Sequence, residues 1–323
     1  PRSTHCISSA ASDVYKRQHL YCVPILCFDH DCLYLILNAI IMSKKQALTT
    51  SCEFFPPRTD KGVLKLHKVR EQLEVLKPAY FSVTFGAGGS TQEKTFETVV
   101  EIQEQSDFDA APHLSCIGST RENILKLLQG YQAHGIKRIV ALRGDQPSGW
   151  AGPLGEFRYA NQLVEFIRAE TGSHFQIEVA AYPECHPQAQ STKADLDFFK
   201  QKVQAGANSA ITQYFYNADA YFRFVDSCAE RGIDIPIVPG IMPISNFEQL
   251  ARFSDTCGAE IPRWLYGHLK DLEADKAALQ AFGVDVVTKL CERLLAGGAP
   301  SLHFYTLNQA GLILEIAKRL DLF

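Results

Sequence analysis

Charged residues stand at the ends of short apolar segments in this 323-residue chain. Arg143, Gly144 and Asp145 directly follow the apolar run 139–142, which has the length and β-branched content of a buried strand. A guanidinium and a carboxylate at such a position could bind a polar ligand, although a structural ion pair would have the same sequence. Glu53 is a second case, because a carboxylate within an apolar strand is costly unless it is paired or neutral. A carboxyl kept protonated by apolar surroundings can act as a general acid, whereas a salt bridge to Arg58 would make Glu53 structural.

Polar residues follow the other apolar segments as well. They are Thr84, His113, Tyr182 with Glu184 and His186, Gln213, and Asn308 with Gln309. Each could be structural, since Thr favours strands and a lone His is often a satisfied core residue. A glycine-rich stretch, 86–89, precedes Ser90 and could hold a phosphate or another ligand, but it completes neither of the usual nucleotide-binding patterns. The histidines show no HxxH or HxxxH spacing, so we expect no metal site.

These polar residues must be positioned by a regular alternation of strands and helices. Eight segments read as strands: 52–55, 80–85, 110–117, 136–142, 176–182, 210–216, 235–241 and 302–307. Helical stretches separate them, and Ser90, Ser119 and Ser245 each have a Glu three residues later, which predicts capping boxes. Glycines that follow periodic segments predict four helix ends, at Gly135, Gly172, Gly206 and Gly232.

The alternation predicts an α/β fold, a (β/α)8 TIM barrel with extra helices in residues 261–298 before the eighth strand. A doubly wound open sheet is the alternative. In a barrel the chemistry takes place at the carboxyl ends of the strands, which is where the polar residues stand. Residues 42–323 are expected to form this single catalytic domain.

Residues 1–41 do not share the pattern, and we predict that they are a non-native or disordered extension before Met42. Their apolar part contains Pro24 and Asp29, which argue against a membrane span. The spacing of the cysteines and histidine at 22, 27, 30 and 32 is not that of a zinc module.

The composition limits which kinds of binding partner and which cellular compartment we expect for the protein. The net charge is −4, and no basic run suggests a nucleic acid or an anionic membrane as partner. Ten cysteines are scattered over a chain without an evident secretory signal, so we expect reduced thiols and a cytoplasmic protein.

Taken together, eight segments give the chain a family resemblance over about residues 48–323. They are Ser51-Cys-Glu-Phe-Phe-Pro-Pro-Arg58, Ser82-Val-Thr-Phe-Gly-Ala87, Ala111-Pro-His-Leu114, Ala141-Leu-Arg-Gly-Asp145, Ala180-Ala-Tyr-Pro-Glu184, Ile211-Thr-Gln213, Pro239-Gly-Ile241 and Phe304-Tyr-Thr-Leu-Asn308. In these segments the chain resembles the bacterial methylenetetrahydrofolate reductases. The resemblance implies a barrel that binds FAD, takes a hydride from NADH or NADPH, and reduces 5,10-methylenetetrahydrofolate to 5-methyltetrahydrofolate for methionine synthesis.

The resemblance also implies roles for individual residues. Glu53 would be the general acid, and Asp145 would lie between flavin and folate. Thr84 and Gln213 would face the nicotinamide, and Gln213 would then serve folate together with Gln249, Phe253 and, more weakly, Gln309. FAD would be held by Phe85, Ala87, His113, Arg143, Gly144, Asp145, Tyr159, Ala160, Tyr182, His186, Ala189, Asp195 and Lys202.

Some positions depart from the pattern of the family, and three of them, Phe198, Gln201 and Gln309, depart from its enterobacterial type. Phe85 stands where a Tyr is common, while Phe198 and Gln201 replace an Asn and an Arg near the FAD phosphates. Gln309 replaces an Arg, which weakens a charge-assisted contact to folate.

Fold alone does not decide function, so two other classes stay open. One is a lyase or aldolase barrel without a redox cofactor, and the other is a non-catalytic barrel that binds flavin or folate. We also expect the chain to form a homo-oligomer.

Overall fold

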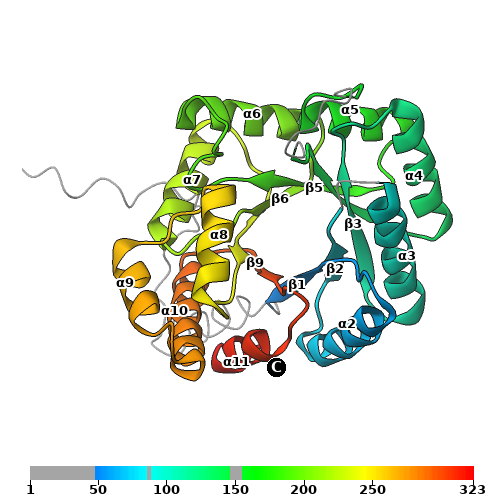
Figure 1. Ribbon diagram of the computed structural model, residues 1–323. Coiled ribbons are helices and arrows are strands. Elements are labelled where there is room, and N and C mark those ends of the chain that lie inside the picture. Colours follow the sequence, from blue (N-terminus) through cyan, green and yellow to red (C-terminus); the bar gives the residue numbers. More distant parts are fainter. Residues whose placement is uncertain (1–47, 86–88, 146–154) are drawn as a thin grey trace, which may run out of the picture. The chain divides into compact units, whose positions relative to one another are not determined.

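A computed structural model describes residues 48–85, 89–145 and 155–323. Residues 48–323 form one compact unit, in which a cylinder of parallel strands is surrounded by helices (Figure 1). The strands are β1 (Thr49–Phe54), β2 (Tyr80–Val83), β3 (Asp109–Ser115), β4 (Arg138–Leu142), β5 (Gln176–Ala181), β6 (Ser209–Thr212), β7 (Ile237–Val238), β8 (Gly240–Ile241) and β9 (Ser301–Tyr305). The TIM-barrel prediction is confirmed.

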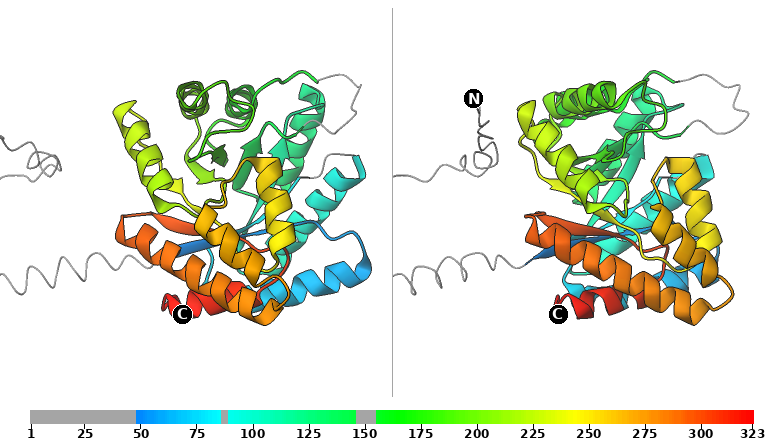
Figure 2. Two further views of the ribbon diagram at one scale, coloured as in Figure 1. Left: turned by 60° about the vertical axis from the view of Figure 1, so that its left-hand side comes forward. Right: turned by 90° about the vertical axis from the view of Figure 1, so that its left-hand side faces the viewer.

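One helix follows most strands and covers the outside of the barrel, as the two turned views in Figure 2 show. The helices are α2 (Asp60–Leu73), α3 (Gly89–Gln105), α4 (Arg121–Ala133), α5 (Ala160–Thr171), α6 (Thr192–Gln204), α7 (Ala218–Glu230), α8 (Phe247–Cys257), α9 (Arg263–Asp271), α10 (Lys276–Ala296) and α11 (Gly311–Arg319), with a 3-10 turn at Glu74–Leu76. Helices α9 and α10 are the extra helices expected before the last strand.

The barrel closes through its seventh strand, which is in two pieces. β7 pairs with β6 and β8 pairs with β9, so the strand changes partner at Pro239. Proline has no N–H to donate, which accounts for the interruption of the ladder at this residue. We call β7, Pro239 and β8 the seam. Because the strand order leads from β6 through the seam to β9 and β1, the open-sheet alternative is wrong.

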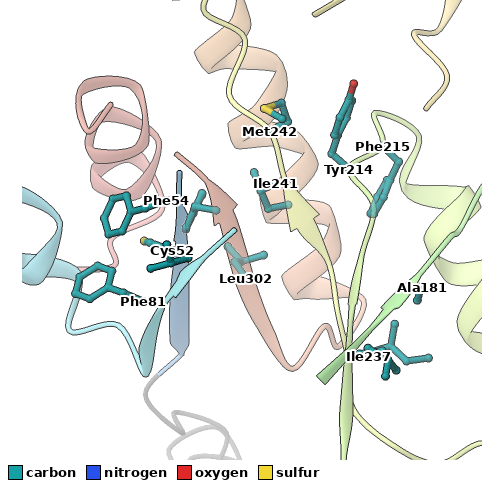
Figure 3. Packing of buried hydrophobic residues seen from close by; sticks show 14 of the residues in the cluster. Cys52, Phe54, Phe81, Ala181, Tyr214, Phe215, Ile237, Ile241, Met242 and Leu302 are labelled. Atoms are coloured by element: carbon teal, nitrogen blue, oxygen red, sulfur yellow. The ribbon is translucent and has the colours of Figure 1, made fainter. Parts of the chain in front are cut away.

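Side chains alternate between the helix side and the interior of each strand. Cys52 and Phe54 of β1 belong to the hydrophobic core under the helices, where Phe54 stacks on Phe81 of β2 with ring centroids 5.3 Å apart (Figure 3). Ser51 and Glu53 alternate with them and therefore face the barrel interior. The same alternation on β9 places Leu302 and Phe304 in the core and directs His303 and Tyr305 inward.

Helix ends were predicted more accurately than helix starts. Gly135, Gly172, Gly206 and Gly232 all have positive φ, as the predicted helix ends require. Two predicted N-caps were wrong by one residue, because Thr120 caps α4 and Asn246 caps α8, in place of Ser119 and Ser245. In each helix the residue nearer the first turn accepts the hydrogen bond from the backbone N–H three positions on. The third predicted cap, Ser90, has a side chain outside the described part of the chain.

Candidate active site

The barrel has a cavity of about 680 Å³ that is lined from the carboxyl ends of its strands. Its walls are largely apolar, with Phe85, Ile117, Leu142, Ile211 and Met242 among the lining residues. Polar groups converge on it from different strands, as in ligand sites of this size. Nine of the predicted site residues line it: Glu53, Thr84, Phe85, His113, Gly144, Asp145, Tyr182, Gln213 and Phe253.

Glu53 is the carboxyl group of the cavity that two histidines flank. Its Oε2 atom lies 3.2 Å from Nε2 of His113 on β3 and 3.6 Å from Nε2 of His303 on β9. Burial raises the pKa of the Glu53 carboxyl, but the charge of His113 and hydrogen bonding to His113 and His303 outweigh burial and lower the pKa to about 2. The surroundings of Glu53 are therefore not purely apolar, because two imidazoles flank the carboxyl and favour its charged form. Neither of these partners is the Arg58 considered from the sequence.

Neighbouring hydrogen bonds hold Glu53 and His303 in place. Nδ1 of His303 lies 2.8 Å from the Ser51 hydroxyl, and Thr306 donates its hydroxyl proton to the backbone carbonyl of Glu53. Asn308 binds both backbone groups of Phe55, at 2.9 Å and 3.0 Å, and so joins the ends of β1 and β9. Asn308 has φ +53, a left-handed conformation that Asn tolerates better than most residues.

Gly144 and Asp145 form the cavity wall after β4. A Cβ atom on Gly144, where φ is +83, would come within 1.8 Å of the Ser115 hydroxyl oxygen. That hydroxyl donates to the carbonyl of Arg143, so the backbone passes very close to β3 here. Asp145 is exposed at this edge, where a bound ligand can reach its carboxylate.

A second group of predicted residues lies beside the cavity without lining it. It consists of Arg143, Tyr159, Ala160, His186, Ala189, Asp195 and Lys202, and we call it the rim set. Arg143 donates to the side chain of Gln188 at 2.5 Å, and Asp195 accepts from the backbone N–H of His186 at 2.8 Å. The His186 ring makes an edge contact with Tyr182 of the cavity wall, with centroids 4.5 Å apart.

Positive charge within the rim set is partly buried. Lys202 donates to the carbonyl of Ala180 at 2.5 Å, and burial lowers its pKa to about 8 although Asp195 opposes the shift. Burial also lowers the pKa of His186. An anionic group placed here would stabilise the charged lysine.

Outside the rim set, two of the described site residues predicted from the sequence, Gln249 and Gln309, do not line the cavity. Gln249 does not line it, although Phe253, one helical turn later on α8, does. Gln309 is exposed on the loop after β9, two residues past the lining residue Leu307. Ala87 lies outside the described residues.

Several site residues were missed from the sequence. His303 and Tyr305 fall within the predicted eighth strand, and Ser51 lies just before the predicted first strand, but none was singled out. The two-residue spacing of Ser51 and Glu53, and of His303 and Tyr305, was a usable signal, since alternate strand residues share a face. Gln92, Tyr214 and Cys257 also line the cavity, and nothing in their local sequence indicates it.

Across residues 48–85, 89–145 and 155–323, no group of three or more His, Cys, Asp or Glu side chains could hold a metal ion. Cys22, Cys27, His30 and Cys32 lie outside these ranges. No helix within the described residues is long and apolar enough to cross a membrane.

The chain is similar to a set of known proteins over most of its length. The family model described as methylenetetrahydrofolate reductase matches residues 37–321. The 5,10-methylenetetrahydrofolate reductases of Salmonella typhimurium and Escherichia coli are each 39% identical over 284 residues, which cover 88% of this chain and 94% of theirs. The NADH-dependent enzyme of Arabidopsis thaliana is 39% identical over 270 residues, or 80% of this chain and 46% of that protein.

A solved structure is similar at the level of the fold. It is an uncharacterized protein from Clostridium thermocellum that binds two copies of 5-methyl-5,6,7,8-tetrahydrofolic acid. The TM-score is 0.59 at 16% identity, and the match covers 89% of this chain and 97% of that chain.

Proposed function

Because the chain belongs to the methylenetetrahydrofolate reductase family and is an oxidoreductase, we propose that it reduces 5,10-methylenetetrahydrofolate to 5-methyltetrahydrofolate with NADH or NADPH as donor and FAD as bound cofactor. Its product would supply methyl groups for methionine synthesis. The observation that carries the proposal is the cluster of Glu53, His113 and His303, an ionisable cluster at the wall of a cavity large enough for stacked rings.

FAD fits the residues of this site. His113 lines the cavity as a buried side chain, with its Nε2 atom 3.2 Å from Glu53 Oε2. The close backbone approach at Gly144 keeps the wall after β4 flat, and the apolar lining suits an aromatic ring system. The rim set, with Lys202 and Arg143, would hold the charged nucleotide part of the cofactor. When bound, FAD would accept a hydride from the nicotinamide and pass it to the folate.

The protein's own contribution is the proton. Opening the methylene bridge of the folate requires a proton on the departing amine, and we assign its delivery to Glu53, which lines the cavity. Because the carboxylate is flanked by two imidazoles, the proton belongs to the cluster as a whole and can reside on any of its three members. The low pKa of Glu53 makes the carboxyl a strong acid whenever it receives that proton.

The remaining lining residues position the rings. Thr84 on the loop after β2 and Gln213 on the loop after β6 present polar groups from different walls, suited to an amide or a pterin edge. Phe253 from α8 supplies an apolar surface. Asp145 supplies negative charge at the edge of the cavity.

Two departures from the family pattern, Phe85 and Phe198, change these contacts. Phe85 lines the cavity and offers no hydroxyl. Phe198 is exposed and stacks on Tyr159, with centroids 5.8 Å apart and planes inclined by 21°. An aromatic surface therefore stands where the enterobacterial type has an amide, and Tyr159 would meet the nucleotide together with Phe198.

The decisive experiment separates the two half-reactions under anaerobic conditions. We expect the purified protein to be yellow, to lose its flavin absorbance on addition of NADH, and to regain it on addition of methylenetetrahydrofolate. A colourless protein that binds no FAD would support the lyase or aldolase class. A yellow protein that neither NADH nor NADPH can reduce, or that methylenetetrahydrofolate cannot reoxidise, would support a binding protein.

A further inference from the structure

Helix α8 forms part of the cavity wall, to which it brings Phe253. Its buried face contains Phe247, Leu250 and Ser254, whose spacing of three and four residues is that of an apolar helical stripe. Serine is unusual in such a stripe, because a buried hydroxyl is costly unless it has a hydrogen-bond partner. A buried serine in the inner face of a wall helix therefore needs an explanation.

The partner of Ser254 is Tyr214, which lies two residues after the end of β6 (Figure 3). The two hydroxyl oxygens are 3.0 Å apart, and the residues are 6% and 3% exposed. Tyr214 lines the cavity, whereas Ser254 does not. A buried hydrogen bond thus joins the loop after β6 to α8.

Each partner of this hydrogen bond stands next to a lining residue that we have proposed to contact the folate. Gln213 precedes Tyr214, and its Oε1 atom accepts from the backbone N–H of Tyr214 at 2.9 Å. Phe253 precedes Ser254 on α8. The hydrogen bond therefore connects an amide and an aromatic ring that line the cavity from two different elements.

Two further attachments of α8 lie beyond its ends. Before the helix, the carbonyl of Ser245 accepts from Nε2 of Gln280 at 3.3 Å, and after it the backbone N–H of Glu260 donates to Glu184 at 2.7 Å. The apolar stripe also holds α8 against the barrel, but apolar burial is non-directional and permits small rotations of the helix about its axis. A hydrogen bond requires a narrow range of distance and angle, so the bond at Ser254 restricts this rotation beside Phe253.

We propose that Tyr214 and Ser254 are positioning residues, whose hydrogen bond sets the separation of Phe253 from Gln213 and thereby the shape of the site that receives the pterin ring of the folate. This inference rests on the proposed function and adds to it the means by which the site keeps its shape. A preformed site spares the ligand the cost of ordering α8 on binding, so the bond should favour folate affinity rather than the chemical step.

The competing explanation is that the bond stabilises the fold and has no effect on ligand binding. Tyr221→Phe is the matched control for it. Tyr221 on α7 is also 3% exposed, donates its hydroxyl to the carbonyl of Ile237 at 2.8 Å, and does not line the cavity. The control therefore removes an equally buried phenol hydroxyl from a bond that does not involve α8.

Steady-state kinetics with methylenetetrahydrofolate test the proposal in Tyr214→Phe, Ser254→Ala and the double variant. We expect each single substitution to raise KM roughly three- to tenfold with kcat changed by less than about twofold. Because both remove the same bond, the double variant should be no worse than the more affected single variant. Tyr221→Phe should keep its KM.

Three results would overturn the proposal. The first is an unchanged KM in Ser254→Ala, since Ser254 can act on the folate only through its bond to Tyr214. The second is a multiplication of the two single effects in the double variant, which would mean that the two hydroxyls act independently. The third is an equal rise of KM in Tyr221→Phe, which would mean that the loss of any buried hydroxyl bond has this effect.

Hydrogen–deuterium exchange of the protein as purified tests the bond without reference to catalysis. We expect the amides in the second half of α8 to exchange faster in Tyr214→Phe and Ser254→Ala than in Tyr221→Phe, and equal exchange would overturn the inference. If the unaltered protein does not turn over methylenetetrahydrofolate, the proposed function and the folate role of this bond fail together. Normal turnover with an unchanged KM in the variants removes the inference alone.

Discussion

Glu53 lies between two histidines, which can supply it with a proton. We therefore expect only the proposed half-reaction that needs a proton to depend on Glu53. In the proposed reaction, hydride transfer from NADH would need no acid at Glu53, whereas the folate step would need a proton. In Glu53→Gln we expect near-normal flavin reduction and reoxidation slowed by roughly two to four orders of magnitude. Stopped-flow traces at matched flavin occupancy measure both. A parallel fall of the two rates, or loss of FAD, would show a structural role, and an unimpaired folate step would exclude the acid role.

The same carboxylate should make stability depend on acid pH. Its pKa in the folded protein, about 2, lies below the ordinary value of 4.5. The contribution to the free energy of unfolding is therefore complete above about pH 4.5 and is lost as the pH falls toward 2. The difference between these two pKa values sets an upper limit of roughly 3.5 kcal/mol on this contribution.

Urea unfolding of the protein and of Glu53→Gln at several pH values measures this dependence. We expect the stability advantage of the unaltered protein to shrink between pH 5 and pH 3. A gap that is constant over this range would mean that Glu53 is not held as an anion by its histidines.

Gln309 can be tested by restoring a charge. It is exposed on the loop that follows the lining residue Leu307, where the carboxylate tail of a folate could leave the cavity. We expect Gln309→Arg to tighten folate binding severalfold, and more so at low salt, without changing flavin reduction by NADH. Gln309→Met, which adds length without charge, is the control. Equal folate affinity in the arginine and methionine variants would count against a contact.

Local sequence was sufficient to find Glu53 but not to find its environment. His303 is 250 positions away in the chain and becomes a neighbour only because β9 pairs with β1. A carboxylate in an apolar segment therefore indicated a site, while the direction of its pKa shift depended on a long-range pairing. The same holds for Glu178, whose partners come from β2 and β4.

At the scale of elements, the seam is where side chains replace the regular ladder. Thr212 at the end of β6 accepts from the backbone N–H of Gly240 through its hydroxyl, and from the Tyr305 hydroxyl through its carbonyl at 2.7 Å. Tyr305 thus crosses from β9 to β6 beneath Gly240. A Cβ on Gly240 would lie 2.2 Å from the Thr212 carbonyl oxygen and 2.6 Å from the Tyr305 ring.

Gly240→Ala should therefore destabilise the protein by about 2–3 kcal/mol, since neither the backbone oxygen nor the packed ring can move away easily. Gly267→Ala is the control, because on α9 a Cβ meets nothing within 4 Å and alanine is the better helix former. Denaturant unfolding should show a loss for the first variant and a gain of about 0.5–1 kcal/mol for the second. Equal stability of Gly240→Ala and the unaltered protein would contradict this account of the seam.

Element types were predictable because their periodicity is local, and all eight predicted strands were found. The two pieces of the seventh strand were not foreseen, although Pro239 was a visible reason for a break. The predicted N-caps of α4 and α8 were wrong by one residue because two adjacent residues in each case have a side chain that could cap the helix. Ser119 precedes Thr120 and Ser245 precedes Asn246, and the local sequence does not show which of the two turns toward the helix.

At the scale of the whole molecule, residues 48–323 contain the barrel and all the site residues found. We predict that deleting residues 1–41 leaves flavin content, melting temperature and turnover unchanged, because the sequence of that segment has neither the periodicity nor the site residues of the barrel. Purification of both forms in parallel measures these quantities. A loss of soluble, flavin-loaded protein on deletion would show that the segment belongs to the fold. The predicted homo-oligomer can be measured by light scattering on the same samples.

Tyr305 belongs both to the cavity wall and to the side-chain bridge across the seam. Ligand occupancy and barrel closure are therefore thermodynamically linked, since a ring that packs against Tyr305 also restrains the bridge between β9 and β6. A cofactor bound against Tyr305 would help to hold the barrel closed, and we expect its release to loosen the molecule first at Pro239.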